Sequence, residues 1–456
     1  MRNRWTLFAL ASVLVSTPAH AQVRVATGDL QAMHLSLGDA IKMASGQAAP
    51  VQLSGLATDE ARARVRQSRA ALLPGLTAGG TWVNRDYDLD ALGLPFPKPK
   101  PGQPSLISLP TIAGPYTAYD ARFTLTETLL DLSSIKRVRA SEAQVQSTIA
   151  AGDATTEGAA QVAALAYLRA ARAQASVAAR QADSAIAAEV LSLAQAQLQA
   201  GVSGTLDVTR AKTQVAVAAG ALVVARNQYD QARIALARAL SVDPVKTVIT
   251  LDDTLSTSLG AASVPADQED AVNQALHSRP ELRAEEARGS AAQVSKSAIQ
   301  SEVLPRVGFE ADYGQSGLTL GSSRSTRQFA VTVSIPLLDG FRRGAQAAEQ
   351  DAVIQESQVR QHDLRQQIAA DVVGALLDLH SAEAQEGIAS QQLSLAADEL
   401  SQAEKRFKAG VAGNIEVIDA QSSMVKARDA VIDARYGAAA ARVALARAAG
   451  AARTLH

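Results

Sequence analysis

The stretch Gln199-Ala-Gly-Val-Ser-Gly-Thr-Leu-Asp-Val208 decides the fold, because it returns in the second half of the chain as Lys408-Ala-Gly-Val-Ala-Gly-Asn-Ile-Glu-Val417. Each copy holds two glycines three residues apart, and an acidic residue follows three residues after the second glycine. Glycine adopts the left-handed backbone that often ends a helix. A carboxylate in the first turn suits the positive end of the next helix. Each copy therefore predicts a tight reversal between two helices.

Two further pairs of segments match in the same order. Leu72-Leu-Pro-Gly75 matches Val303-Leu-Pro-Arg306, and Leu125-Thr-Glu-Thr-Leu-Leu-Asp131 matches Val333-Ser-Ile-Pro-Leu-Leu-Asp339. Three matched segments in one order predict a duplicated unit that is too long for a short solenoid repeat. We place the first repeat at 22–240 and the second at 268–450. A linker at 241–267 joins them, and a short tail follows at 451–456.

The regions around the glycine turns are typical of long helices. No proline occurs between Tyr116 and Asp243, and none follows Pro336, so neither tract has a helix breaker. Residues 133–199 would form a helix of about 100 Å, with a local weakness or a junction near Gly152 and Gly158. After each turn, apolar and small residues recur every seven positions, which predicts a left-handed supercoil of closely packed helices. The first series are Val208, Val215, Leu222, Tyr229, Leu236 and Ala211, Ala218, Ala225, Ala232, Ala239; the second are Val417, Met424, Val431, Ala438, Leu445 and Ala420, Ala427, Ala434, Ala441, Ala448. An ordinary antiparallel bundle has the same periodicity.

Between the long helices, each repeat contains one predicted β-hairpin, at about 75–128 and about 306–336. Apolar residues alternate with polar ones, as in Phe123 and Leu125 against Arg122 and Thr124, which marks strands with one apolar face. The fold class is therefore mainly α with a small β part. Four strands cannot close a barrel in lipid, where open sheet edges are not tolerated. Either several chains pool their strands, or the hairpins pack as a small soluble sheet on the helices.

The N-terminus has the pattern of a secretory signal peptide at residues 1–21. A basic Met1-Arg-Asn-Arg4 precedes an apolar run from Trp5 to Val15 and an Ala19-His-Ala21 cleavage site. No later stretch reaches the roughly 18 apolar residues of a membrane-spanning helix. The chain has no cysteine, which excludes disulfides, cysteine metal sites and a lipid-modified N-terminal cysteine.

Composition and motifs give no support for an enzyme or a nucleic-acid-binding protein. The net charge is −1, and no dominant basic patch suggests a nucleic-acid partner. The histidines lack metal-ligand spacing, no glycine-rich phosphate loop follows a strand, and Gly201-Val-Ser-Gly204 is not a nucleophile elbow. We therefore expect a protein without catalytic residues, cofactor or metal site.

The signal peptide, the duplicated helix–hairpin–helix plan, the Leu-Leu-Asp strand exits and the paired Ala-Gly-Val-x-Gly-x-x-Asp/Glu-Val turns resemble the TolC-like outer-membrane efflux proteins. The resemblance extends from about Leu35 to Gly450. It implies a homotrimer in the outer membrane of a Gram-negative bacterium that extends into the periplasm. Three chains would share one 12-stranded β-barrel in outer-membrane lipid, continued by a long periplasmic α-helical barrel. An inner-membrane pump and a periplasmic adaptor protein would be its partners, in efflux or in type I secretion.

The resemblance also implies roles for particular residues. The glycine turns would form the periplasmic tips that contact the adaptor, through Gly201, Val202, Gly204, Gly410, Val411 and Gly413. Glu416 and Asp419, three apart on one helix face, would form charged rings at a closed entrance that favour cations, with Asp207 as their first-repeat counterpart. A plain capping role at the helix N-terminus also fits Asp207 and Glu416. Strand-to-helix junctions would lie at Asp131, Asp339 and Pro336.

The sequence departs from the family pattern at the entrance and at one strand exit. Family members often carry a basic residue between the second-repeat glycine and the acidic pair, where this chain has Val411-Ala-Gly-Asn414. Thr128 replaces the proline found at Pro336, which predicts a gentler first junction. The proline-rich insert 88–114 is expected to be an extended loop at the hairpin tip. The alternative to a channel is a soluble periplasmic coiled-coil scaffold in which the hairpins only connect helices.

Overall fold

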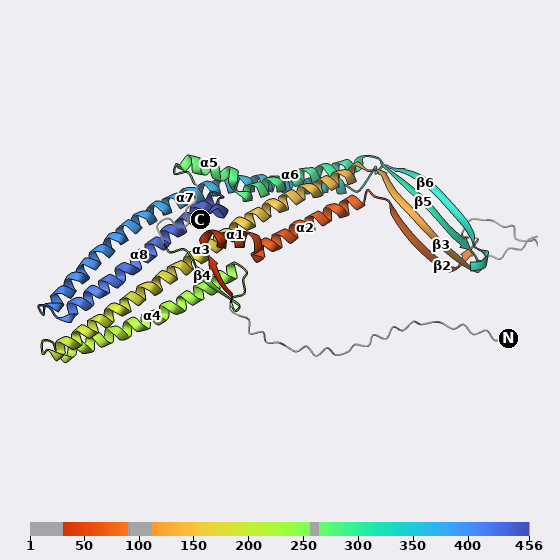
Figure 1. The fold of residues 1–456 in the computed structure, drawn as a ribbon. Coiled ribbons are helices and arrows are strands. Elements are labelled where there is room, and N and C mark those ends of the chain that lie inside the picture. The colour runs from red at the N-terminus through yellow and green to blue at the C-terminus, as the bar shows by residue number, and fades with distance from the viewer. Residues whose placement is uncertain (1–30, 90, 92–111, 256–263, 456) are drawn as a thin grey trace, which may run out of the picture.

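The computed structural model describes residues 31–89, 91, 112–255 and 264–455. The molecule is a long rod with a β-sheet at one end and two helix–turn–helix tips at the other (Figure 1). A smaller layer of short helices and strands lies between the two ends (Figure 1). The predicted signal peptide and most of the predicted proline-rich loop lie outside the described residues.

The same order of seven elements occurs twice along the chain. The first series is β1 (Gln31–Leu35), α1 (Leu37–Gln47), α2 (Ala49–Ala70), β2 (Gly75–Asp88), β3 (Ile112–Leu130), α3 (Leu132–Gln199) and α4 (Thr205–Ala239). The second is β4 (Thr247–Leu251), α5 (Gln268–Ser278), α6 (Pro280–Gln300), β5 (Arg306–Gly317), β6 (Arg324–Ser334), α7 (Arg342–Lys408) and α8 (Asn414–Ala448). Short 3-10 turns lie at Ser301–Val303, Leu320–Ser322 and Ala452–Thr454.

The first strands of the two series pair with each other. β1 and β4 run parallel, from Gln31 opposite Thr247 to Leu35 opposite Leu251. β4 lies inside the interval 241–267 that the sequence assigned to a linker, and β1 was not predicted. Strands of five residues are too short to show a clear alternation. Their pairing is set by contacts between distant parts of the chain.

The long helices are continuous. α3 has 68 residues and α7 has 67, and α3 runs without a break past Gly152 and Gly158. The expectation of a junction at these glycines was wrong. α3 packs against α2, α4, α6 and α8, so its neighbours compensate for the low helix propensity of two glycines.

The heptad positions form the packed seams of α4 and α8. Every member of the four series is buried or half-buried, and Ala211 and Val417 have no exposed surface. α4 packs on α3, and α8 packs on α7. The small alanines let the paired helices approach closely, as the sequence predicted.

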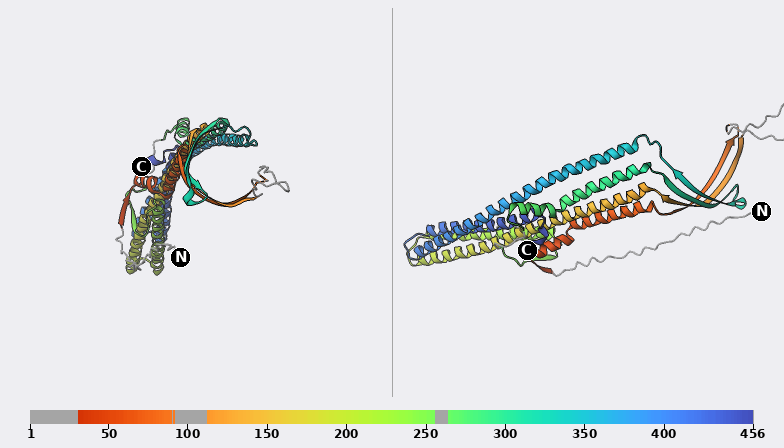
Figure 2. Two further views of the ribbon diagram at one scale, coloured as in Figure 1. Left: turned by 90° about the vertical axis from the view of Figure 1, so that its right-hand side faces the viewer. Right: turned by 90° about the horizontal axis from the view of Figure 1, so that it is seen from above.

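The two hairpins join into one antiparallel sheet in the order β2-β3-β5-β6. β3 pairs with β5 through registers such as Phe123 opposite Tyr313. β3 begins at Ile112, within the expected loop, and continues to Leu130. The sheet curves as an arc (Figure 2). Its outer strands, β2 and β6, have no strand partner on their free edges within the described residues.

The sheet has one apolar and one polar face. The pairing of residues across neighbouring strands places many aromatic and aliphatic side chains on the same face of the sheet, including Leu76, Trp82, Phe123, Phe329 and Val331. All five are more than half exposed. The other face carries Arg122, whose guanidinium pairs with Asp120 and lies 3.0 Å from Asp312 Oδ1. Gly314 stands opposite Arg122, and a Cβ at Gly314 would lie 2.4 Å from the Cβ of Arg122. Glycine therefore allows the strands to come this close.

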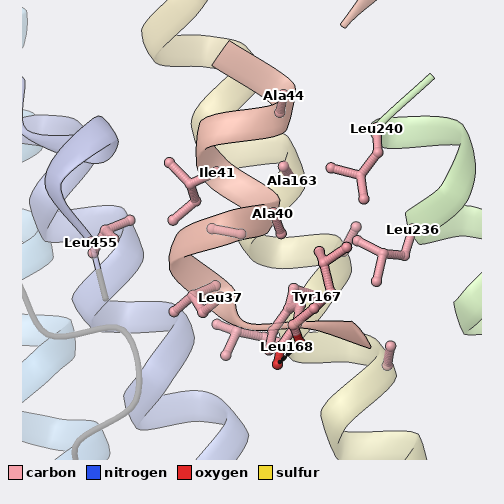
Figure 3. Packing of buried hydrophobic residues seen from close by; sticks show 14 of the residues in the cluster. Leu37, Ala40, Ile41, Ala44, Ala163, Tyr167, Leu168, Leu236, Leu240 and Leu455 are labelled. Carbon is pink, nitrogen blue, oxygen red and sulfur yellow. Dashed lines mark hydrogen bonds between the residues drawn. The ribbon is translucent and has the colours of Figure 1, made fainter. Parts of the chain in front are cut away.

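The main core lies midway along the rod, where α1, α3, α4 and the C-terminal residues meet (Figure 3). Tyr167 of α3 is fully buried there. Its hydroxyl lies 3.0 Å from the carbonyl oxygen of Leu35 and 2.9 Å from Asp253 Oδ2. Burial raises the pKa of Tyr167, and the nearby Asp253 carboxylate adds to the rise.

Residues 451–455, which the sequence assigned to a tail, pack into this core. Leu455 is 3% exposed. Buried Glu157 accepts hydrogen bonds from the Ala452 amide (3.0 Å) and from Arg453 Nε (2.6 Å). The end of the described chain is therefore fixed to the middle of α3.

One helix within the described ranges, α4, is long and apolar enough to cross a membrane by length and composition alone. Its most apolar window has a mean hydropathy of 1.2, and 17% of that window is buried. The sequence expectation of no such helix therefore does not hold by this measure. The exposed face of α4 carries Val223, Val224 and Ile234, so an apolar helix face is uncovered in the single chain.

Candidate functional site: helical tips and strand exits

The two glycine turns have the same backbone. Gly201 and Gly410 have φ angles of 73° and 72°, the left-handed region that a side chain disfavours. The amide of Val202 donates to the carbonyl of Gln197 at 2.9 Å, and the amide of Val411 donates to that of Arg406 at 3.1 Å. This six-to-one bond with a left-handed glycine is the Schellman helix ending. The predicted reversals at both tips are confirmed.

Hydrogen bonds join the two tips to each other. Gln197 Nε2 donates to the carbonyl of Phe407 at 2.8 Å. Asn414, which is fully buried, donates from Nδ2 to the carbonyl of Asp207 at 2.8 Å. A cluster of apolar side chains from all four helices lies beneath: Val190, Ala194, Val208, Ala211, Leu400, Ala403, Phe407, Val417 and Ala420. Sequence reasoning missed Gln197 and Asn414, because local sequence does not show which carbonyl an amide will meet.

The predicted entrance carboxylates lie in different surroundings. Glu416 is exposed, and its Oε2 lies 3.1 Å from Arg406 Nε across the turn. Asp419 is exposed and has no ion pair within the described residues. Asp207 is half-buried and lies 3.9 Å from Arg210 of its own helix. The single chain thus leaves Asp419 as the unpaired member of the three.

Arg406 supplies the basic partner that the sequence lacked at the expected place. The sequence has no basic residue between the second-repeat glycine and the acidic pair, and its nearby basic residues, Lys405, Arg406 and Lys408, lie on the other side of the turn. The last turn of α7 instead brings a guanidinium back across the reversal to Glu416. The reversal of the chain places residues 406 and 416 side by side. Their separation of ten residues in the sequence does not by itself predict this contact.

At the first strand exit, Asp131 caps α3. Its carboxylate accepts hydrogen bonds from the amides of Ser133 (2.9 Å) and Ser134 (3.2 Å) and from both serine hydroxyls. Arg306 at the start of β5 lies 3.8 Å away. Burial raises the pKa of Asp131, but the serine hydrogen bonds and Arg306 outweigh it and lower the pKa to about 2.

The second strand exit has a different geometry. β6 ends at Ser334, and α7 begins only at Arg342. Asp339 is therefore not the N-cap residue of α7, although its carboxylate still accepts hydrogen bonds from the first-turn amide and from Nε of Arg343. Arg343 Nη2 donates to the carbonyl of Pro336. Phe341 takes the last position before α7 with a left-handed φ of 64°. Relative to the matched segments, β6 ends earlier than β3; the gentler bend predicted for the first junction stays a prediction.

A buried carboxylate also joins the elements at the strand exits. Glu302 is 4% exposed and pairs with Arg137 of α3 and with Arg342 of α7, the latter at 3.1 Å. Burial raises the pKa of Glu302, and the two guanidinium groups lower it overall. Sequence reasoning missed this residue, which lies one position before the matched Val303–Arg306 segment.

Ion pairs connect α3 to α8 along the rod. Arg180 Nη2 lies 2.5 Å from Asp429 Oδ1, Arg428 pairs with Asp183, and Arg172 lies 2.7 Å from Asp433. Burial raises the pKa of Asp429, and nearby Asp183 adds to the rise although Arg180 opposes it. The two repeats are therefore joined by charges as well as by the apolar cluster at the tips.

The sequence model of the outer membrane efflux protein family matches residues 41–242 and 271–451. The chain belongs to this family. Among curated relatives, the pyoverdine export outer membrane protein OpmQ of Pseudomonas putida is 25% identical over 272 residues, or 57% of this chain and 55% of OpmQ. The outer membrane efflux protein BepC of Brucella suis is 26% identical over 271 residues, or 58% and 56%. The chain thus matches about half the length of these relatives.

A solved structure in the family has the same fold. CusC is 18% identical and superposes with a TM-score of 0.73 over 91% of this chain and 92% of CusC. The TolC-like resemblance seen in the sequence is therefore confirmed, and family membership places the protein in the outer membrane and periplasm. The roles of the tip and exit residues remain predictions.

Proposed function

We propose that the protein is the outer-membrane exit channel of a tripartite efflux or type I secretion system. It receives substrates from an inner-membrane pump and a periplasmic adaptor protein and conducts them across the periplasm and the outer membrane. It carries out no catalysis. The named relatives are an exporter and an efflux protein, which supports a role in export.

The observation that carries this proposal is the open sheet. Its four strands expose an apolar face and leave both outer edges without strand partners in the described part of the chain. Lipid tolerates an apolar face but no open edge. Pairing β2 of one copy with β6 of the next would close the edges. In our proposal, three copies form a 12-stranded barrel with the polar Arg122 face lining the interior.

The helical part would continue the barrel through the periplasm. α4 exposes an apolar face in the single chain, and such a face is more stable against a neighbouring copy than in water. The tips lie at the far end of the rod, where Val202 and Val411 are 67% and 70% exposed. We assign the adaptor contact to these tips, from Gly201 to Gly204 and from Gly410 to Gly413.

The entrance would lie at the same end. Three copies of Asp419 would form a ring of unpaired carboxylates, which attracts cations. Glu416 would contribute less to this ring, because Arg406 lies 3.1 Å from it. Asp207 would contribute least, since it is half-buried and close to Arg210.

Single-channel recording of the purified protein in planar bilayers tests the proposal. Under a salt gradient the wild type should conduct with a preference for cations. Asp419→Asn should reduce that preference more than Glu416→Gln, because a ring charge that is already paired adds less to the local potential. Glu269→Gln, an exposed carboxylate at the start of α5, is the matched control and should leave selectivity unchanged.

One result would contradict the channel, and another would contradict only the position of its entrance. A protein recovered as a soluble periplasmic monomer, without heat-modifiable trimers in membrane extracts, would favour the coiled-coil scaffold. Channels whose selectivity is the same in all three variants would leave the exit duct in place but remove Asp419 from the entrance.

A further inference from the structure

A cavity of about 430 Å³ lies between the two repeats, above the tips. α3 and α4 of the first repeat line one side, and α8 lines the other, with Leu400 of α7. Its volume falls within the range of small-molecule sites in proteins. The apolar walls include Val217, Ala218, Ala221 and Met424.

Gln421 of α8 lines this cavity with an amide that has no hydrogen-bond partner among the residues that the structure describes. The residue is 5% exposed, and neither its Nε2 nor its Oε1 makes a hydrogen bond in that part of the chain. A buried amide without partners carries a substantial free-energy cost. Gln421 is thus a buried donor and acceptor at an apolar wall, the combination that fixes the orientation of a ligand.

The charged groups around the cavity balance. Arg180 and Lys426 contribute two cations, and Asp183 and Asp419 contribute two anions. Asp183 pairs with Arg428, and Arg180 pairs with Asp429. The lining therefore gives no net preference for an anion or a cation, and its chemistry fits a neutral ligand.

We propose that this cavity is a binding site for a small neutral molecule that joins an apolar body to a carboxamide-like group, held by the side-chain amide of Gln421. The ligand N–H would donate to Gln421 Oε1, and the ligand carbonyl would accept from Nε2. The apolar body would lie against the valine and alanine wall of α4. This inference stands independently of the proposed channel function.

Both repeats contribute residues to the site, so ligand binding depends on the position of one repeat relative to the other. α4 supplies the apolar wall and α8 supplies the amide. A ligand that contacts both would stabilise this separation of the two helices, because it binds this arrangement better than a wider one. Since Asp419 also lines the cavity, the occupant would lie beside the carboxylate that we assign to the entrance.

Benzamide and acetophenone are suitable probes, because they share one shape and the same carbonyl group and differ only by an NH2 group against a CH3 group on that carbonyl. Their dissociation constants are measured by equilibrium dialysis on the full protein in lipid nanodiscs, with empty nanodiscs subtracted. Wild type should bind benzamide about tenfold more tightly than acetophenone, since acetophenone leaves Gln421 Oε1 unpaired. In Gln421→Leu the two probes should bind with nearly equal affinity.

Two further variants locate the site. Ala221→Leu narrows the cavity at the α4 wall. It should weaken the binding of both probes by the same factor, so that the ratio of their dissociation constants is retained. Gln391 is an exposed glutamine of α7 outside the cavity. Gln391→Leu should change neither of the two dissociation constants. Equal binding of the two probes to wild type, or the same loss in Gln391→Leu as in Gln421→Leu, would overturn the proposal. So would full benzamide binding in Ala221→Leu.

Discussion

Asp131→Ala should open the start of α3. In the structure the Asp131 carboxylate accepts four hydrogen bonds from Ser133 and Ser134, two from amides and two from hydroxyls. The first amides of a helix have no partner within the helix. Alanine would remove the acceptor and leave buried donors unpaired.

The expected cost is about 2 kcal/mol. Removal of a helix cap costs roughly 0.5–2 kcal/mol. The pKa of Asp131 is lowered from 3.8 to about 2, and each pKa unit corresponds to about 1.4 kcal/mol, which gives about 2.5 kcal/mol, close to the upper end of that range. The two figures describe the same hydrogen bonds and do not add.

Amide hydrogen exchange over residues 132–140, followed by mass spectrometry, measures this effect locally. Exchange in Asp131→Ala should be roughly 5–30 times faster than in the wild type at the same pH. Asp131→Asn keeps an acceptor and should show a smaller effect. Asp339→Ala changes the matching residue of the second repeat, which bonds to the start of α7, and should leave this segment of α3 unchanged.

The effect depends on pH in a defined direction. Because the folded-state pKa of Asp131 lies below 3.8, its stabilisation is present above about pH 4 and is lost as the pH falls toward 2. The ratio of exchange rates between variant and wild type should therefore fall over this interval. An Asp131→Ala protein with wild-type exchange at pH 6, or a ratio that does not change with pH, would refute the capping argument.

Two further predictions concern the tips. Gly410→Ala places a Cβ at a φ of 72° and should destabilise the second turn by about 1–2 kcal/mol, seen as faster amide exchange at that tip; unchanged exchange would mean that the turn relaxes to another conformation. Asn414→Leu removes the 2.8 Å bond to the carbonyl of Asp207 and should broaden the distance distribution between spin labels on cysteines replacing Val202 and Val411. The chain has no native cysteine, so only these two positions carry labels, and mixing labelled with excess unlabelled chains isolates the distance within one chain. An unaltered distribution would remove Asn414 as a link between the tips.

The sequence alone determined the parts of this protein that depend on neighbours along the chain. The heptad seams, the glycine reversals at Gly201 and Gly410 and the alternation around Phe123 are local patterns. The seams and the alternation were visible because a helix repeats every 3.6 residues and a strand every two, and the reversals were visible because glycine permits the left-handed backbone that ends a helix. The duplication also predicted the order of the elements in each repeat, because the three matched segments occur in the same order in both halves of the chain. Asp131 and Asp339 matched as a pair, although only Asp131 is the N-cap residue of its helix.

Only the tertiary structure decided which distant groups meet. The pairing of β1 with β4, the Arg406–Glu416 contact, the bond from Asn414 to Asp207 and the buried amide of Gln421 each need residues brought together by the fold. Local propensity carries no information on such contacts, because a hydrogen bond or ion pair depends on where the partner backbone lies. The repeats could be read from the chain, but the site between them exists only when they pack.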